Sequence, residues 1–144
     1  KITICNSVLF YKKVLEIKQK LENLGHEVLI HPMEVSFKGN IIPVIEFYNL
    51  RKSTSNQDIE NLKSSLIKDH FDKIEDSDAI LVLNYDKNGI KNYIGGNVLM
   101  EIGLACHFNK KIYLLNQIPE ELSYTEEIKG VQPIILNGDI TKIK

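Results

Sequence analysis

The sequence has little of several residue types that would mark a special class of protein. It holds two cysteines, four prolines and no tryptophan among 144 residues. Two cysteines cannot supply the disulfide framework of a small secreted domain, so we expect free thiols, a reducing compartment and a cytoplasmic location. No apolar run reaches the roughly 18 residues that a membrane span needs, so we expect no membrane partner.

An excess of charge of one sign is also lacking. Eighteen basic residues face nineteen acidic ones, for a net charge of −1, which argues against a polymeric nucleic acid as partner. The four histidines and two cysteines show no metal-ligand spacing, and neither a dinucleotide fingerprint nor a P-loop is present. We therefore expect no metal and no bound cofactor. A chain of 144 residues with 43% hydrophobic residues suits a single domain, residues 1–144.

Short apolar runs alternate with helical patterns along the chain. The expected strands are Ile2–Cys5, Glu27–Ile30, Ala79–Leu83, Lys111–Leu115 and Pro133–Leu136. The expected helices cover residues 9–24, 55–75, 95–108 and part of 120–129. This alternation predicts right-handed βαβ units and a parallel sheet. The fold class is therefore α/β, a three-layer Rossmann- or flavodoxin-like sandwich with a five-stranded parallel sheet.

The segment from Met33 to Thr54 does not fit this alternation. It contains Pro43 and an apolar-aromatic patch over residues 44–48. We interpret it as a loop with a short helix that lies over the ligand-binding edge of the sheet. Its aromatic residues could form a lid that stacks on a base, or they could pack as core or as a dimer interface: Phe37, Phe47 and Tyr48.

Glu101 is the most informative candidate for chemistry. It follows Gly95, Gly96 and Asn97 in a helix that comes after the strand Ala79–Leu83. This order places the acid at the carboxyl edge of a parallel sheet, where ligands bind in open α/β sheets. Glycines there let the backbone approach a ligand closely, so we expect Gly95, Gly96 and Asn97 to shape the substrate-binding pocket. A carboxylate near a helix N-terminus is expected to be ionised, as a glycosyl-transferring nucleophile must be.

Four segments of the chain resemble the nucleoside 2-deoxyribosyltransferase-like superfamily, which includes deoxynucleoside monophosphate N-glycosidases. They are the opening strand and helix, the connection Gly25–Val28 that leads into the second strand, the Asp78–Val82 strand, and the run Glu101-Ile102-Gly103-Leu104-Ala105. The resemblance implies a flavodoxin-like fold in a homodimer or higher oligomer with shared active sites. It also implies cleavage or transfer at the N-glycosidic bond of a small-molecule nucleoside or nucleotide. Glu101 matches the nucleophile that forms a glycosyl-enzyme, the logic of retaining glycosidases.

The resemblance implies further site residues. Asn6 and Ser7, after the first strand, match the loop that binds the sugar, and Asn137 matches a late polar residue that reaches into the neighbouring subunit's site. The opening loop lacks the glycine- and arginine-rich pattern of phosphate-binding members, which favours a nucleoside over a 5′-monophosphate. Tyr85, after the third strand, is a candidate for contact with the sugar or base.

Two positions depart from the family pattern. Gly95 stands where family transferases usually carry an aspartate, six residues before the nucleophile. A second family aspartate stands eight residues before the acid that precedes the third strand, and counting back from Asp78 gives His70. Asp69 and Asp72 flank it. The histidine or an adjacent aspartate could protonate a leaving base, or the histidine could simply cap the site. Glu101, His70 and Asp78 are therefore the catalytic candidates.

Two other functions remain open from the sequence. An NAD-type nucleotide glycohydrolase would use the same glutamate but would need room for a second nucleotide. A catalytically inactive nucleotide-binding module would keep the fold and lose turnover, and Gly95 in place of the family aspartate is the feature that favours it.

Overall fold

A parallel sheet of five strands forms the centre of the computed structural model, which describes residues 1–144, in the order β2-β1-β5-β6-β7. The strands are β1 (Ile2–Cys5), β2 (Val28–Leu29), β5 (Ala79–Val82), β6 (Lys111–Leu114) and β7 (Ile134–Ile135). β1 and β5 are buried along their whole length, as expected for central parallel strands covered on both faces. The predicted fold class, a three-layer Rossmann- or flavodoxin-like sandwich, is confirmed.

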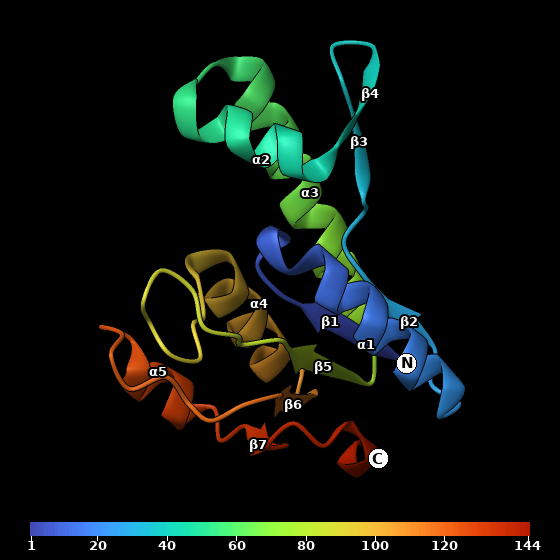
Figure 1. Cartoon of the computed structure of the whole chain (residues 1–144), viewed down its shortest axis with the longest axis vertical. Helices are drawn as coiled ribbons and strands as arrows, with labels where there is room; N and C mark the ends of the chain where they lie inside the picture. Colours follow the sequence, from blue (N-terminus) through green and yellow to red (C-terminus); the bar gives the residue numbers. More distant parts are fainter.

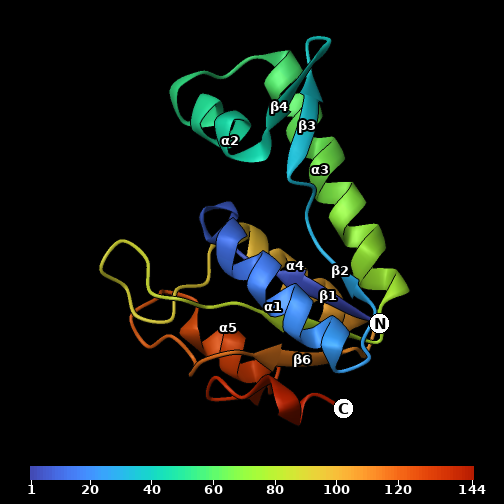
Figure 2. The same cartoon turned by 45° about the vertical axis from the view of Figure 1, so that its right-hand side comes forward.

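Helices cover both faces of this sheet (Figures 1 and 2). One face is covered by α1 (Tyr11–Asn23) and the terminal 3₁₀ turn η2 (Ile140–Lys142). The other is covered by the second half of α3 (Gln57–Asp76), α4 (Gly96–His107) and α5 (Thr125–Gly130). A 3₁₀ turn, η1 (Val8–Phe10), joins β1 to α1.

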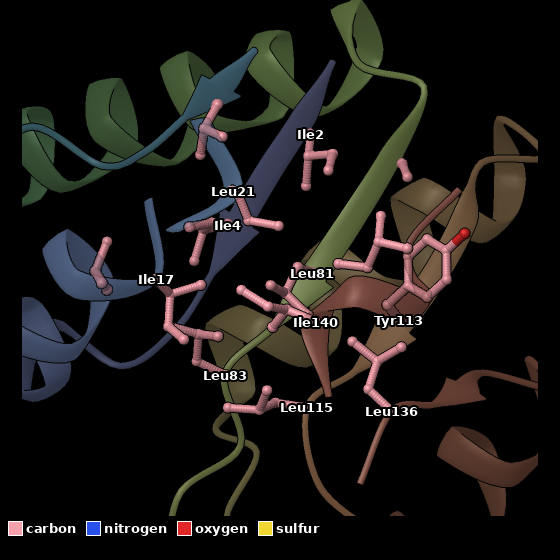
Figure 3. Close-up of a cluster of buried hydrophobic side chains, with 14 residues drawn as sticks. Ile2, Ile4, Ile17, Leu21, Leu81, Leu83, Tyr113, Leu115, Leu136 and Ile140 are labelled. Carbon is pink, nitrogen blue, oxygen red and sulfur yellow. The ribbon is translucent and has the colours of Figure 1, made fainter. Parts of the chain in front are cut away.

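The two faces carry separate hydrophobic cores because successive strand residues point in opposite directions. In β5, Leu81 packs towards α1, whereas Ile80 and Val82 pack towards α4. Figure 3 shows Ile17 and Leu21 of α1 gathered against the strand residues of the first core. Both cores consist almost wholly of aliphatic side chains, so burial of apolar area supplies the main stabilisation of the sandwich.

A separate extension rises beyond the carboxyl edge of the sheet (Figures 1 and 2). It consists of an antiparallel hairpin, β3 (Glu34–Phe37) and β4 (Asn40–Pro43), the helix α2 (Val44–Ser53) and the first half of α3. We call this extension, residues 34–66, the cap. Its small core centres on Val35, Phe47 and Ile59. The predicted short helix is present as α2, but the prediction of a loop was wrong for residues 34–43, which form the hairpin.

Element boundaries differ from prediction at several places. α3 begins at Gln57, two residues later than predicted, because the Asn56 side-chain oxygen caps it by accepting a hydrogen bond from the Ile59 amide at 3.0 Å. β2 and β7 are two residues long, shorter than predicted, since both are edge strands that pair on one side only. None of the helices combines the length and apolar character needed to cross a membrane.

Candidate functional site

A pocket of about 310 Å³ lies between the cap and the carboxyl edge of the sheet. It opens beside β1 and β5. The strand order reverses at this point, because β2 lies on one side of β1 and β5 lies on the other. Such switch points are the usual ligand sites of open α/β sheets. Five residues proposed from the sequence as substrate-binding line this pocket, together with Glu101: Asn6, Ser7, Gly95, Gly96 and Asn97.

Glu101 lies in the wall of this pocket although its side chain is 5% exposed. Its Oε1 atom is 3.7 Å from His31 Nε2 and 3.8 Å from His70 Nε2. The Cys5 Sγ atom lies 3.7 Å from the same nitrogen of His70. The two nitrogen–oxygen distances are longer than a hydrogen bond, so the carboxyl touches both imidazoles without bonding to either.

Three buried polar atoms at this site have no hydrogen-bond partner in the protein: Asn6 Oδ1, His70 Nδ1 and Glu101 Oε2. Buried polar groups in folded proteins are nearly always paired, and an unpaired one costs free energy. Asn6 and Glu101 both line the pocket, so their side chains are available to a polar ligand, although the two unpaired oxygens are closed to solvent in the free protein. This arrangement is suited to binding a small polar molecule.

Burial sets the protonation of the cluster. It raises the pKa of Glu101 to about 8, an effect that the Cys5 thiol only partly opposes. Burial also lowers the pKa of His31 to about 4 and that of His70 to about 2, with the Lys73 charge adding to both. Near pH 7 the free protein therefore holds a mostly neutral carboxyl beside two neutral imidazoles.

The expectation of an ionised Glu101 was wrong for the free protein. Glu101 is the sixth residue of α4, whereas the electrostatic influence of a helix N-terminus falls off within the first turn. Desolvation of the charged form is then the larger effect.

His31 is a site residue that the sequence analysis missed. Its ring stacks on that of His70, with centroids 3.6 Å apart and planes 7° from parallel. It is the second residue after β2, so it stands at the same edge of the sheet as Asn6. Its place directly after a predicted strand is the signal that could have found it.

Asp78 is not part of the site. It precedes β5, at the amino edge of the sheet, and its side chain is 85% exposed. Parallel strands have their amino ends at one edge and their carboxyl ends at the other, so the four residues of β5 separate Asp78 from the pocket by about 13 Å. The prediction of Asp78 as a catalytic residue was therefore wrong.

Tyr85 and Asn137 also lie outside the pocket of this chain. The Tyr85 ring packs edge-on against Phe10, with centroids 5.4 Å apart, and borders the core on the α1 face. It is a packing residue here. Asn137 accepts a hydrogen bond from Gln117 at 2.7 Å, beyond the edge strand β7. Its role in a neighbouring subunit's site stays a prediction.

The structure explains why a residue without a side chain stands at position 95. It is the N-cap of α4, with an extended backbone that any residue can adopt. A Cβ atom at this position would lie 3.3 Å from Tyr93 Cε1. A side chain at position 95 would therefore press against the Tyr93 ring, which lines the pocket beside it.

Cys5, His70 and Glu101 are the side chains of this site that could hold a transition-metal ion. One ligand atom from each lies within 4.8 Å of the others. His31 is not a fourth ligand in this geometry, because its ring is stacked parallel to that of His70 and an ion lies near the plane of each imidazole that binds it.

Comparison with known proteins finds no relative of this chain. Neither a family model, nor a curated protein, nor a solved structure matches this chain. The function is therefore argued from the site.

Proposed function

We propose that this chain cleaves or transfers the N-glycosidic bond of a nucleoside or nucleotide, with Glu101 as the nucleophile. The observation that carries the proposal is the Glu101 carboxyl, nearly buried in a pocket at the sheet switch point, with one oxygen that has no partner. A buried carboxyl with a free oxygen is positioned to attack a carbon that the pocket presents to it. The family resemblance of the surrounding sequence supports the same role.

The chemistry needs one proton to move before the bond breaks. Glu101 holds this proton near pH 7 because its pKa is about 8, whereas His70, with a pKa of about 2, does not retain it. The His70 imidazole, 3.8 Å from the carboxyl, therefore acts as a relay that passes the proton on to the departing base in the same step that forms the carboxylate. The carboxylate oxygen then bonds to the anomeric carbon, and the bond from that carbon to the base nitrogen breaks. His70 donates the proton to the departing base, and its low pKa makes its protonated form a strong acid.

The second half of the reaction releases the sugar. Water, or the nitrogen of a second base, attacks the anomeric carbon of the glycosyl-enzyme and restores the Glu101 carboxyl. Two displacements at one carbon retain its configuration. Hydrolysis and transfer differ only in which acceptor occupies the place of the first base.

The size of the pocket favours one nucleoside or nucleotide over a dinucleotide. A volume of about 310 Å³ lies at the lower end of the range for small-molecule sites, roughly 300–1,000 Å³. An NAD-type glycohydrolase needs space for a second nucleotide.

The proposal includes the homodimer and the cytoplasmic location expected from the sequence. Cys5 and Cys106 are free thiols in the structure.

A nucleotide-binding module without turnover is the second candidate. The feature that favours it is the neutral state of Glu101 near pH 7, together with Gly95 in place of the family aspartate. Such a module would bind the same ligand class without breaking a bond.

A substrate panel separates these functions. Free-base release is measured from 2′-deoxynucleosides, their 5′-monophosphates, the matching ribonucleotides and NAD. Release from a deoxynucleoside or its monophosphate supports the proposal, and release from NAD alone supports the glycohydrolase. Binding without release from any compound, read by thermal shift, would reject catalysis in favour of the binding module.

A further inference from the structure

The lining of the pocket has a marked excess of positive charge. Its cap side and its rim carry Arg51 from α2, Lys63 from α3 and Lys87 from the loop between β5 and α4. Glu101 is the one carboxylate among the lining residues, and it is largely neutral near pH 7. The pocket therefore offers three cations to a ligand, although the whole chain has a net charge of −1.

None of the three cations is neutralised by the protein. Twelve ion pairs are formed in the structure, and neither Arg51, Lys63 nor Lys87 takes part in any of them. All three side chains are nevertheless partly buried. Partly buried cations without carboxylate partners are costly, and an anion bound between them removes that cost.

Two of these cations are held in place by neutral groups. The Lys87 ammonium donates a hydrogen bond to Ser7 Oγ at 3.1 Å and lies 5.1 Å from the centre of the Tyr93 ring. The Arg51 guanidinium lies 5.6 Å from the centre of the Tyr48 ring, and the Lys87 ammonium lies 5.9 Å from the same centre. The Tyr48 ring thus brings both cations to one part of the pocket without cancelling either charge.

We propose that the ligand carries a phosphate group held by Arg51, Lys63 and Lys87, so that the substrate is a nucleotide rather than a nucleoside. For the base and sugar, this inference rests on the proposed function. Arginine binds phosphate through two parallel N–H groups, and lysine binds it as a point charge. These contacts come from the cap and the rim, and they replace the glycine- and arginine-rich opening loop whose absence had favoured a nucleoside.

Binding of a phosphate far from the broken bond has a consequence for catalysis. Contacts to a part of the substrate that does not react hold the anomeric carbon against Glu101. They come from three different elements, α2, α3 and the loop between β5 and α4, so a bound phosphate links the cap to the edge of the sheet.

The test compares two triple variants of equal charge change. Arg51→Gln/Lys63→Gln/Lys87→Gln removes the pocket cations, whereas Lys12→Gln/Lys68→Gln/Lys91→Gln removes three exposed lysines that do not line the pocket. Both are made in the Glu101→Gln background, so that no turnover disturbs the titration. The ligands are the four common 2′-deoxynucleoside 5′-monophosphates and the four matching nucleosides, titrated by calorimetry.

We expect a monophosphate to bind the Glu101→Gln protein and the control triple about tenfold or more tightly than its nucleoside, the scale of one charge-assisted contact. In the pocket triple the two ligands bind alike. Three results would overturn the inference. They are equal affinities of monophosphate and nucleoside for the Glu101→Gln protein, a preference for the monophosphate that persists in the pocket triple, and no binding of any monophosphate.

A second measurement applies if the pocket triple does not fold. The monophosphate affinity of the Glu101→Gln protein falls as salt rises from 50 to 500 mM, while the nucleoside affinity stays constant. A preference for the monophosphate that salt does not change would contradict the phosphate site. Because both readouts are binding, a protein that passes them but releases no base would disprove the proposed function alone. Base release from nucleosides without a phosphate preference would disprove this inference alone.

Discussion

At the scale of single residues, the site depends on the neutral state of the Glu101 side chain. The carboxyl touches the His31 and His70 imidazoles and the pocket, and none of these neighbours stabilises its charge in the free protein. A carboxyl held neutral in this way becomes a reactive nucleophile when it loses its proton, because the buried anion is poorly solvated. Both its stability and its chemistry should therefore depend on pH.

The first prediction concerns stability. The folded pKa of Glu101 is about 8, against 4.5 for an ordinary glutamate, so the folded state holds a proton that the unfolded state releases between these values. Stability from this residue is complete below about pH 4.5 and is lost as pH rises towards 8. Glu101→Gln should therefore gain stability over the parent, by on the order of a few kcal/mol at pH 9 and by much less at pH 5.

Urea unfolding at pH 5 and pH 9 measures this difference. Glu121→Gln, an exposed glutamate outside the pocket, serves as the control and should show no such trend. An advantage of Glu101→Gln that is the same at both pH values would contradict a raised pKa for Glu101.

The second prediction concerns His70. If its Nε2 atom takes the proton of Glu101 and passes it to the base, His70→Asn should slow single-turnover base release about a hundredfold, within the range for acid–base catalysis. Substrate affinity should change by much less. His26→Asn, a histidine far from the pocket lining, is the matched control. A His70→Asn rate close to that of the parent would remove His70 from the mechanism.

At the scale of elements, α3 joins the cap to the sheet. Ile59 in its first turn packs into the cap core, whereas Ile74 near its end packs under the sheet. His70 lies between these two regions, on the turn before Ile74. The position of the cap and the position of His70 are therefore set by one rigid helix.

The third prediction tests the cap core. Phe47 is 1% exposed and packs with Val35 and Ile59. Phe47→Ala should cost about 3–5 kcal/mol of unfolding free energy and weaken ligand binding, because the helix that carries Arg51 loses its anchor. Phe108→Ala, at a ring that is 37% exposed, should cost about 1 kcal/mol or less. Chemical denaturation measures both, and equal costs would contradict a packed cap.

The elements that were predicted correctly are those that a single continuous stretch of sequence specifies. The aliphatic run of β5 and the glycine-preceded α4 are examples, since a buried strand and a helix start are local signals. The hairpin was missed although its signals are present. Val35 and Phe37 alternate with polar residues, and Lys38 and Gly39 form a two-residue turn with positive φ angles. Four-residue strands are too short for alternation to stand out.

At the scale of the whole molecule, the candidate site is assembled from parts that are distant in the sequence. Asn6, Gly95 and Glu101 could be predicted because each follows a strand end that the sequence indicates. His31 directly follows a predicted strand and carries the same signal, whereas Cys5 lies within β1 and reaches His70 only when α3 packs on the sheet. The cap cations could not be predicted at all, because their convergence depends on how α2 and α3 fold over the pocket.

The fourth prediction concerns assembly. If the active sites are shared, the protein sediments as a dimer or higher oligomer of its 16.5 kDa chain. Asn137, which lies outside the pocket of its own chain, then contributes to that of a neighbour. Asn137→Ala should lower base release at least tenfold, while Gln132→Ala, another exposed amide, should not. A monomer by sedimentation at assay concentration would contradict the shared site.

The most direct measurement is single-turnover base release by Glu101→Gln beside the parent and Glu121→Gln, with the best substrate of the panel. We predict a loss of about a hundredfold or more in Glu101→Gln, the scale of removing a nucleophile, with substrate still bound and with Glu121→Gln unchanged. Glutamine preserves the shape of the side chain but cannot form the glycosyl ester. Base release by Glu101→Gln at the parental rate would contradict the account, because the bond would then be broken without the residue on which the site is centred.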